Sequence, residues 1–220
     1  NWNDPNLRFV DLNGDGHADI LITESEIFTW YPSKAEKGFD QAQSETQPRD
    51  EQAGPHLVFA DGTQSIYLAD MSGDGLTDLV RVRNGSVCYW PNLGYCKWGA
   101  MVMMENAPHF DSLDIFNQSR IRLADIDGSG TNDIIYLSAE GPKIYFNYCG
   151  NAWSEARTLH QFPPIDNLST VTTTDLKGNG TACFVWSSLL PSEGEALRYV
   201  DLMGGNKPHR SEEASCRERV

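Results

Sequence analysis

The stretch DLNGDGHAD, residues 11–19, decides the fold because it sets oxygen-bearing side chains at alternate positions around two glycines. The carboxylates of Asp11, Asp15 and Asp19 repel one another at this spacing, which costs folding free energy unless a cation lies among them. The stretch recurs as DMSGDGLTD at 70–78, DIDGSGTND at 125–133 and DLKGNGTAC at 175–183. The four copies start 59, 55 and 50 residues apart, so the chain is built from a repeating unit.

Short β-prone runs surround each copy. LRFV and ILITE flank the first copy, for example, and SIYLA and LVRVR flank the second. A third run follows as IFTWYP, SVCYWPNLG, KIYFNYCG and, less clearly, LRYVDLMGG, and a fourth follows the middle copies at AMVMMEN and ARTLHQF. No stretch has a helical period. Four short strands in each period of about 50 residues indicate a propeller blade, so we expect an all-β fold, a partial β-propeller of about four blades.

One segment departs from this pattern. Residues 34–55, KAEKGFDQAQSETQPRDEQAGP, are polar and have few apolar anchors. We therefore expect a surface insertion or a mobile loop within the first blade.

Composition narrows the classes of protein. The net charge of −14 comes without a basic stripe, which argues against nucleic acid and anionic membrane surfaces as partners. No apolar run approaches the roughly 18 residues of a membrane span. The start, NWNDPNLRF, has no signal-peptide pattern, and the lack of a first Met suggests an internal piece of a longer chain. The five cysteines form no CxxC pair, so each is expected to be a small buried or incidental residue rather than a disulfide or zinc ligand.

The loops offer oxygen ligands, which hard divalent cations prefer, and several carboxylates around one centre favour Ca²⁺ over Mg²⁺. The expected ligands are the side chains of Asp11, Asn13, Asp15 and Asp19 with the His17 carbonyl, those of Asp70, Ser72, Asp74 and Asp78 with the Leu76 carbonyl, and those of Asp125, Asp127, Ser129 and Asp133 with the Thr131 carbonyl. An EF-hand begins in the same way, but its twelfth position needs a bidentate Glu. Ile22, Arg81 and Tyr136 stand there instead. The remaining alternative is that these are Asp/Gly turns with capping roles.

The fourth loop breaks the ligand pattern. Lys177 stands where a ligand is expected, and Cys183 replaces the last Asp. We expect this loop to be metal-free, with the Lys177 charge offsetting Asp175.

The repeated pattern resembles the FG-GAP/VCBS repeat of integrin-like propellers and of many secreted bacterial proteins. The runs YWPNLGYCKWGAMVMM, RIRLADIDGSGTNDIIYL, ACFVWSSLLP and LRYVDLMGGNKPH are similar to the middle/N-terminal region of the insecticidal toxin complex B subunit, a Salmonella-virulence-plasmid-B-like family. The resemblance covers residues 1–209. It implies a secreted virulence protein whose propeller docks on a pore-forming A subunit and which forms a shell with a C subunit. That role is a scaffold, not a catalyst.

The tail RSEEASCRERV, residues 210–220, departs from this family and has no apolar pattern. It is expected to be disordered or artefactual.

Two other classes of function remain to be weighed. An enzyme is disfavoured because the loop carboxylates are assigned to a metal and no GxSxG or HExxH motif occurs. An integrin-like or lectin-like adhesion module is the alternative, since six Trp and eight Tyr can stack on sugars. Aromatics at strand positions such as Trp90 and Trp186 are nevertheless expected to form the core between blades.

Overall fold

The computed structural model describes residues 2–112, 114–160, 170–187 and 197–202. The described part of the chain consists of β-strands and three short 3₁₀ helices, η1 (Ala35–Lys37), η2 (Gly62–Gln64) and η3 (Gln118–Arg120). The predicted all-β fold is confirmed. Among the described residues there is no helix long and apolar enough to cross a membrane.

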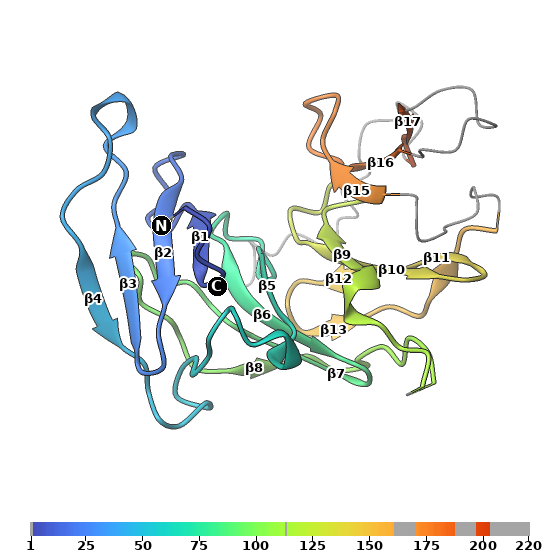
Figure 1. Ribbon diagram of the computed structural model, residues 1–220. Helices are drawn as coiled ribbons and strands as arrows, with labels where there is room; N and C mark the ends of the chain where they lie inside the picture. The colour runs from blue at the N-terminus through green and yellow to red at the C-terminus, as the bar shows by residue number, and fades with distance from the viewer. Residues whose placement is uncertain (1, 113, 161–169, 188–196, 203–220) are drawn as a thin grey trace.

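Four antiparallel sheets follow one another along the chain as propeller blades (Figure 1). The first contains β1 (Leu7–Val10), β2 (Asp19–Thr23), β3 (Ile27–Tyr31) and β4 (Gln43–Thr46). The second contains β5 (Ile66–Ala69), β6 (Asp78–Arg83), β7 (Ser86–Trp90) and β8 (Val102–Met103). The third contains β9 (Ile121–Ala124), β10 (Asp133–Ser138), β11 (Gly141–Tyr145) and β14 (Arg157–Thr158), with a small hairpin of β12 (Asn147–Tyr148) and β13 (Ala152–Trp153). The fourth contains β15 (Thr170–Thr174), β16 (Cys183–Ser187) and β17 (Leu197–Val200).

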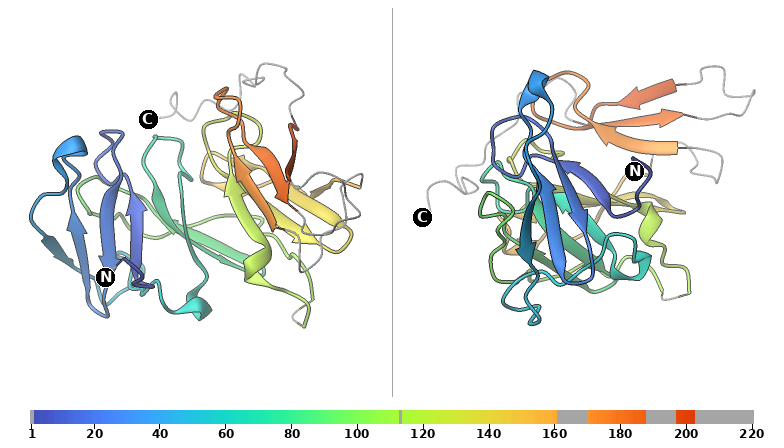
Figure 2. Two further views of the ribbon diagram at one scale, coloured as in Figure 1. Left: turned by 45° about the horizontal axis from the view of Figure 1, so that its top comes forward. Right: turned by 60° about the vertical axis from the view of Figure 1, so that its left-hand side comes forward.

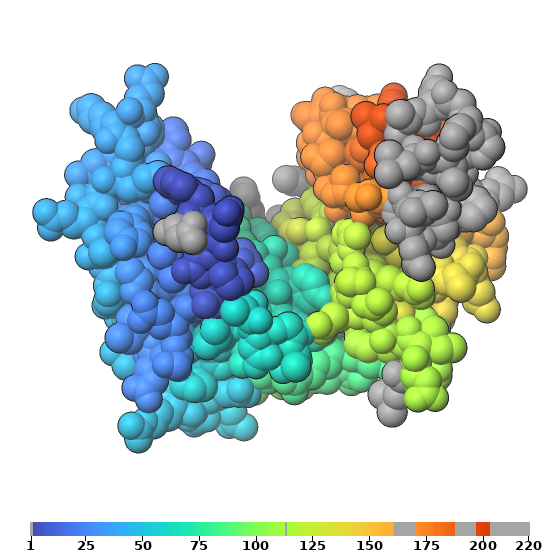
Figure 3. Space-filling model, in the orientation of Figure 1, coloured from blue at the N-terminus to red at the C-terminus, as the bar shows by residue number. Residues whose placement is uncertain are grey.

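The register explains where the repeated stretches lie. Val10 pairs with Asp19 and Ala124 with Asp133, so each repeat is the connection between the first two strands of its blade. The four loops therefore occupy equivalent positions in the four blades. The blades follow an arc that is hollowed between the first and the fourth (Figures 1–3).

The apolar core lies between neighbouring blades. A strand such as DIIYLS is buried along its whole length because alternate side chains face the preceding and the following blade. The first interface contains Leu21, Trp30, Leu79 and Trp90; the second, Val80, Tyr89, Ile134 and Trp153; the third, Ile135, Ile144, Phe184 and Trp186. The expected core role of Trp90 and Trp186 is confirmed.

The expectation of a surface insertion or mobile loop at residues 34–55 is wrong, because this segment supplies β4. All four β4 residues are exposed, so no apolar alternation marks the strand. The segment is also fixed to the protein. The buried Gln47 side chain donates to the carbonyls of Glu24 (2.9 Å) and Leu57 (3.0 Å), and accepts from the Leu57 N–H (2.8 Å).

The expectation for the cysteines is partly wrong. Cys88, Cys96 and Cys183 are free and buried, as expected. Cys149 is disulfide-bonded, and no CxxC motif in the sequence indicated this bond. Cys216 and the tail at 210–220 lie outside the described residues.

Candidate metal loops at the blade hairpins

The first Asp of each loop fixes the shape of that loop. One carboxylate oxygen of Asp11 accepts the Gly14 N–H at 2.7 Å, and the other accepts the Gly16 N–H at 2.7 Å. The same pair of bonds recurs from Asp70 to Gly73 and Gly75, from Asp125 to Gly128 and Gly130, and from Asp175 to Gly178 and Gly180. Gly16 has a φ of +83°, which disfavours a side chain.

The last Asp of the first three loops is fully buried and joins two elements. One oxygen of Asp133 accepts the Ile126 N–H inside its loop (3.0 Å), and the other accepts the Asn147 N–H after the third strand (2.9 Å). The equivalent partners are Leu12 and Ser33 for Asp19, and Met71 and Asn92 for Asp78. Each of these carboxylates therefore ties its loop to the end of the third strand.

Burial disfavours the charged form of these groups. It raises the pKa of Asp78 to about 6 and the pKa of Asp133 well above its usual value. It also raises the pKa values of Asp19, Asp70 and Asp125, and neighbouring loop carboxylates contribute in the same direction. A cation among these groups would relieve both costs.

The third loop brings its carboxylates closest together. One oxygen each of Asp125, Asp127 and Asp133 lie within 4.8 Å of one another. No other three His, Cys, Asp or Glu side chains in the described residues converge in this way. An all-oxygen set with three carboxylates suits a hard cation such as Ca²⁺.

In the other two loops the middle carboxylate stands at the fifth loop position, as Asp15 and Asp74, whereas Asp127 stands at the third. Asp15 accepts the His17 N–H at 2.8 Å and the Asn13 side-chain amide at 3.1 Å. Asp74 accepts the Leu76 N–H at 2.8 Å. These loops supply the expected oxygen atoms but do not bring their three carboxylates together as the third loop does.

The other expected ligands also lie in the loops. The Ser72 hydroxyl is buried and has no hydrogen-bond partner among the described residues, so one oxygen of the second loop is left for a ligand. Ser129 and Thr131 lie beside each other in the third loop, with their hydroxyl oxygens 3.0 Å apart. His17 is exposed, and its backbone N–H rather than its ring takes part in the loop. The donor set therefore fits calcium in chemical type.

Sequence reasoning missed the residues that follow the third strands. The Asn147 side-chain amide donates to the carbonyls of Met71 (3.0 Å) and Asn132 (3.1 Å), and its oxygen accepts the Gly150 N–H (2.8 Å). It therefore connects the loops of the second and third blades. Asn92 accepts the Gly94 N–H in the same way at 2.8 Å. The sequence offered one sign of this role, an Asn near the end of the third β-prone run in both repeats, in WPNLG and in YFNYCG.

Successive loops are also joined through the backbone. The Asn132 N–H donates to the Asp70 carbonyl (2.8 Å), and the Ala182 N–H donates to the Asp125 carbonyl (2.7 Å). The loops of the last three blades consequently form one connected rim.

The fourth loop keeps its turn but pairs its charges differently from the expectation. The Lys177 ammonium forms an ion pair with Asp201, directly after β17, and not with Asp175. Backbone N–H groups instead stabilise the Asp175 carboxylate and lower its pKa, led by that of Gly180.

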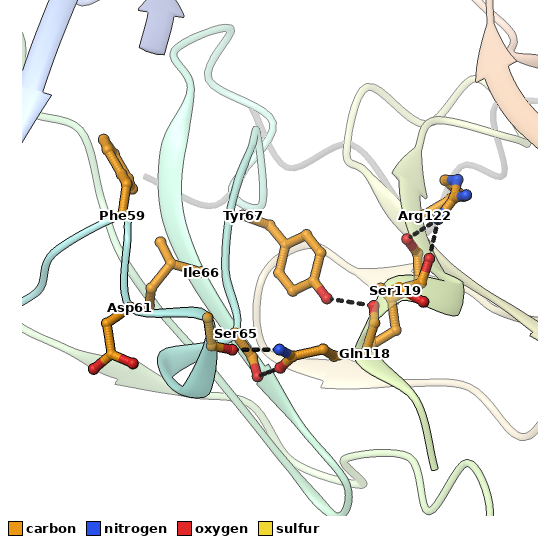
Figure 4. A pocket seen from close by; sticks show the side chains of 10 residues that line it. Phe59, Asp61, Ser65, Ile66, Tyr67, Gln118, Ser119 and Arg122 are labelled. Atoms are coloured by element: carbon orange, nitrogen blue, oxygen red, sulfur yellow. Dashed lines mark hydrogen bonds between the residues drawn. The ribbon is translucent and has the colours of Figure 1, made fainter. Parts of the chain in front are cut away.

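A cavity of about 310 Å³ lies where β5 and β9 begin, at the ends of these strands that are away from the metal loops (Figure 4). The Tyr67 hydroxyl donates to the Gln118 carbonyl (2.8 Å), the Ser65 hydroxyl donates to the Gln118 side chain, and Arg122 donates to the Ser119 carbonyl (2.7 Å). Burial raises the pKa of Tyr67 to about 12, which keeps it a donor. These polar groups are hydrogen-bonded to one another, and the bonds of Ser65 and Tyr67 to Gln118 join the second blade to the third. We therefore assign the cavity to the contact between these two blades.

Comparison with known proteins adds three findings. The FG-GAP-like repeat family matches residues 11–81, which include the first two loops. A Tc holotoxin pore from Photorhabdus luminescens has a TM-score of 0.69 and 25% identity, over 90% of this chain and 9% of that one. A TcdB2–TccC3–Cdc42 complex has a TM-score of 0.58 and 19% identity, over 92% of this chain and 14% of that one.

A lectin from Agrocybe aegerita, solved for its recognition of non-reducing terminal N-acetylglucosamine, shares the fold alone. Its TM-score is 0.60 at 18% identity, over 81% of this chain and 45% of that one. The comparison with curated proteins finds no match. This chain spans a small part of the toxin chains that it resembles. It therefore carries an FG-GAP-like repeat within a propeller that is similar in structure to components of Tc toxins.

Proposed function

We propose that this chain is a non-catalytic propeller segment of a toxin-complex B-type subunit and serves as scaffold and docking surface for the pore-forming A subunit. The observation that carries the proposal is the similarity to the Photorhabdus luminescens Tc holotoxin pore across 90% of the chain. A C subunit would complete the shell. The assembly would act outside the bacterial cell, as a secreted virulence factor.

We further propose that the first three loops bind Ca²⁺ and that the fourth does not. Support comes from the repeated oxygen donors, the convergence of Asp125, Asp127 and Asp133, and the unpartnered Ser72 hydroxyl. Calcium would offset the repulsion among buried carboxylates and stiffen each hairpin.

The non-catalytic part of the proposal rests on what the carboxylates do. The buried Asp19, Asp78 and Asp133 use both oxygens to hold backbone N–H groups. A carboxylate engaged in this way and facing a cation is a poor general base. A scaffold needs only this rigidity.

The test is association with the pore-forming component. The B-type protein that contains this chain is mixed with the A-type component, and binding is measured by interferometry. Deleting residues 1–209 should abolish binding, while a deletion of similar length elsewhere in the shell serves as the control. Association that survives loss of residues 1–209 would show that the docking role is wrong.

A further inference from the structure

The outer strand of the first blade has an open edge. In the described residues β4 pairs only with β3 (Figure 1). The Gln47 N–H donates to the Glu26 carbonyl at 2.8 Å, which fixes which residues face β3. Backbone polar groups alternate in direction along an antiparallel strand. Those of Ser44 and Thr46 therefore point away from the sheet.

This edge is longer than those of the outer strands in the second and third blades. The outer strands β8 and β14 have two residues each, whereas β4 has four, all exposed. Short or highly charged outer strands protect a sheet from unwanted pairing. Since β4 is longer than β8 and β14 and carries Glu45 as its one charge, it is more open to an added strand than either of them.

A cavity of about 290 Å³ lies beside β4, between the first and second blades. Its apolar wall is formed by Phe28, Pro48, Pro55, Leu93 and Trp98. The Phe28 and Trp98 ring centroids are 6.2 Å apart, and the buried Trp98 indole N–H has no hydrogen-bond partner in the part of the chain that the structure describes. A cavity of this size, at the lower limit for ligand sites, suits one side chain.

The cavity and the open edge are aligned. Phe28 pairs directly with Glu45, so their side chains share one face of the sheet. An added residue opposite Glu45 would also place its side chain on that face, next to the cavity. The main chain would meanwhile bond Ser44 and Thr46.

Charge indicates the sign of the partner. Residues 24–51 contain seven carboxylates and three cationic side chains. Asp40 pairs with Lys34 and Glu51 with Arg81, each at 2.9 Å. The five remaining carboxylates of this segment still outnumber its two remaining cations and Lys97, which lines the cavity, so the surroundings of β4 are negative. A basic partner would be attracted and oriented.

We propose that β4 is a docking edge for an extended, basic polypeptide segment. The segment adds a fifth strand to the first blade and places one apolar side chain in the cavity beside Phe28 and Trp98. This goes beyond the scaffold role and requires no metal ion.

The probe is the capped peptide Lys-Val-Lys-Leu-Lys-Val-Lys, labelled and titrated with the 220-residue chain by fluorescence anisotropy. Thr46→Pro should weaken binding about tenfold, because it removes an outward N–H and blocks the edge. Thr158→Pro is the matched control on another outer strand, β14. The Leu159 N–H donates to the Pro142 carbonyl of the same sheet, so the N–H of its neighbour Thr158 points away from the sheet, as that of Thr46 does. It should leave binding unchanged.

Hydrogen exchange on the unsubstituted chain covers the case in which Thr46→Pro does not fold. The peptide should slow exchange of the Ser44 and Thr46 amides, and a peptide N-methylated at alternate residues should not. Equal binding of both peptides, or no slowing, would overturn the proposal. Dimerisation without peptide, detected by sedimentation and lost in Thr46→Pro, would assign the edge to a second copy and would also overturn it.

Discussion

Asp133→Ala should destabilise the protein even without calcium. The carboxylate is fully buried and accepts the N–H groups of Ile126 and Asn147. Its loss leaves two buried donors unpaired, each costing about 1–3 kcal/mol, so we expect a total loss of about 2–6 kcal/mol. That is a large share of a typical free energy of unfolding of about 5–15 kcal/mol.

The assay is urea denaturation in EGTA and again in calcium. Asp127→Ala is the control, because the Asp127 carboxylate accepts one backbone bond within its loop, from the Ser129 N–H at 2.9 Å, and is less buried than Asp133. In EGTA the control should lose about 1 kcal/mol or less. In calcium both variants should lose the stabilisation that comes from the third site. Equal stabilities of Asp133→Ala and the unsubstituted chain in EGTA would refute the assigned role of the buried carboxylate.

Three further perturbations test the loops and the first blade. Calcium at a concentration a hundredfold above Kd should add about 2.7 kcal/mol per site to the free energy of unfolding, so the melting temperatures in calcium and in EGTA should differ. Identical melts, together with no bound calcium on elemental analysis, would contradict the metal proposal. The double change Lys177→Asp and Cys183→Asp should create a weak additional site, detected as extra bound calcium by calorimetry. Gln47→Ala should lower the free energy of unfolding in urea by about 1–3 kcal/mol, because it leaves buried partners unpaired. The control Gln41→Ala, at an exposed position, should leave it almost unchanged. Equal effects would mean that Gln47 does not anchor its segment.

The repeated loops could be predicted from sequence because their requirements are local. An Asp that holds two backbone N–H groups, with glycines at positive φ, needs residues only a few positions apart. The blades followed from the spacing of the loops and from the apolar strands around them. The calcium assignment remains a prediction.

The rest depended on contacts between distant residues. β4 has no apolar alternation because all its side chains are exposed, so only its pairing with β3 reveals it. Asp133 ties its loop to the end of the third strand only through its bond from the Asn147 N–H, and Asn147 lies 14 residues away in the sequence. Lys177 was assigned to Asp175, its neighbour in the loop, whereas its partner Asp201 lies 24 residues away.

The fourth blade shows how the same two elements can be joined without a buried carboxylate. In the third blade, Asp133 at the start of the second strand reaches the backbone after the third strand. In the fourth blade Cys183 takes that position, and the carboxylate stands instead at Asp201, after the third strand. Lys177 extends from the loop to meet it, so an ammonium group links loop and strand. Because the cation is a side chain of the chain itself, the charge of Asp201 is neutralised without a metal ion. This agrees with the sequence of the fourth loop, in which Lys177 and Cys183 replace two of the expected metal ligands.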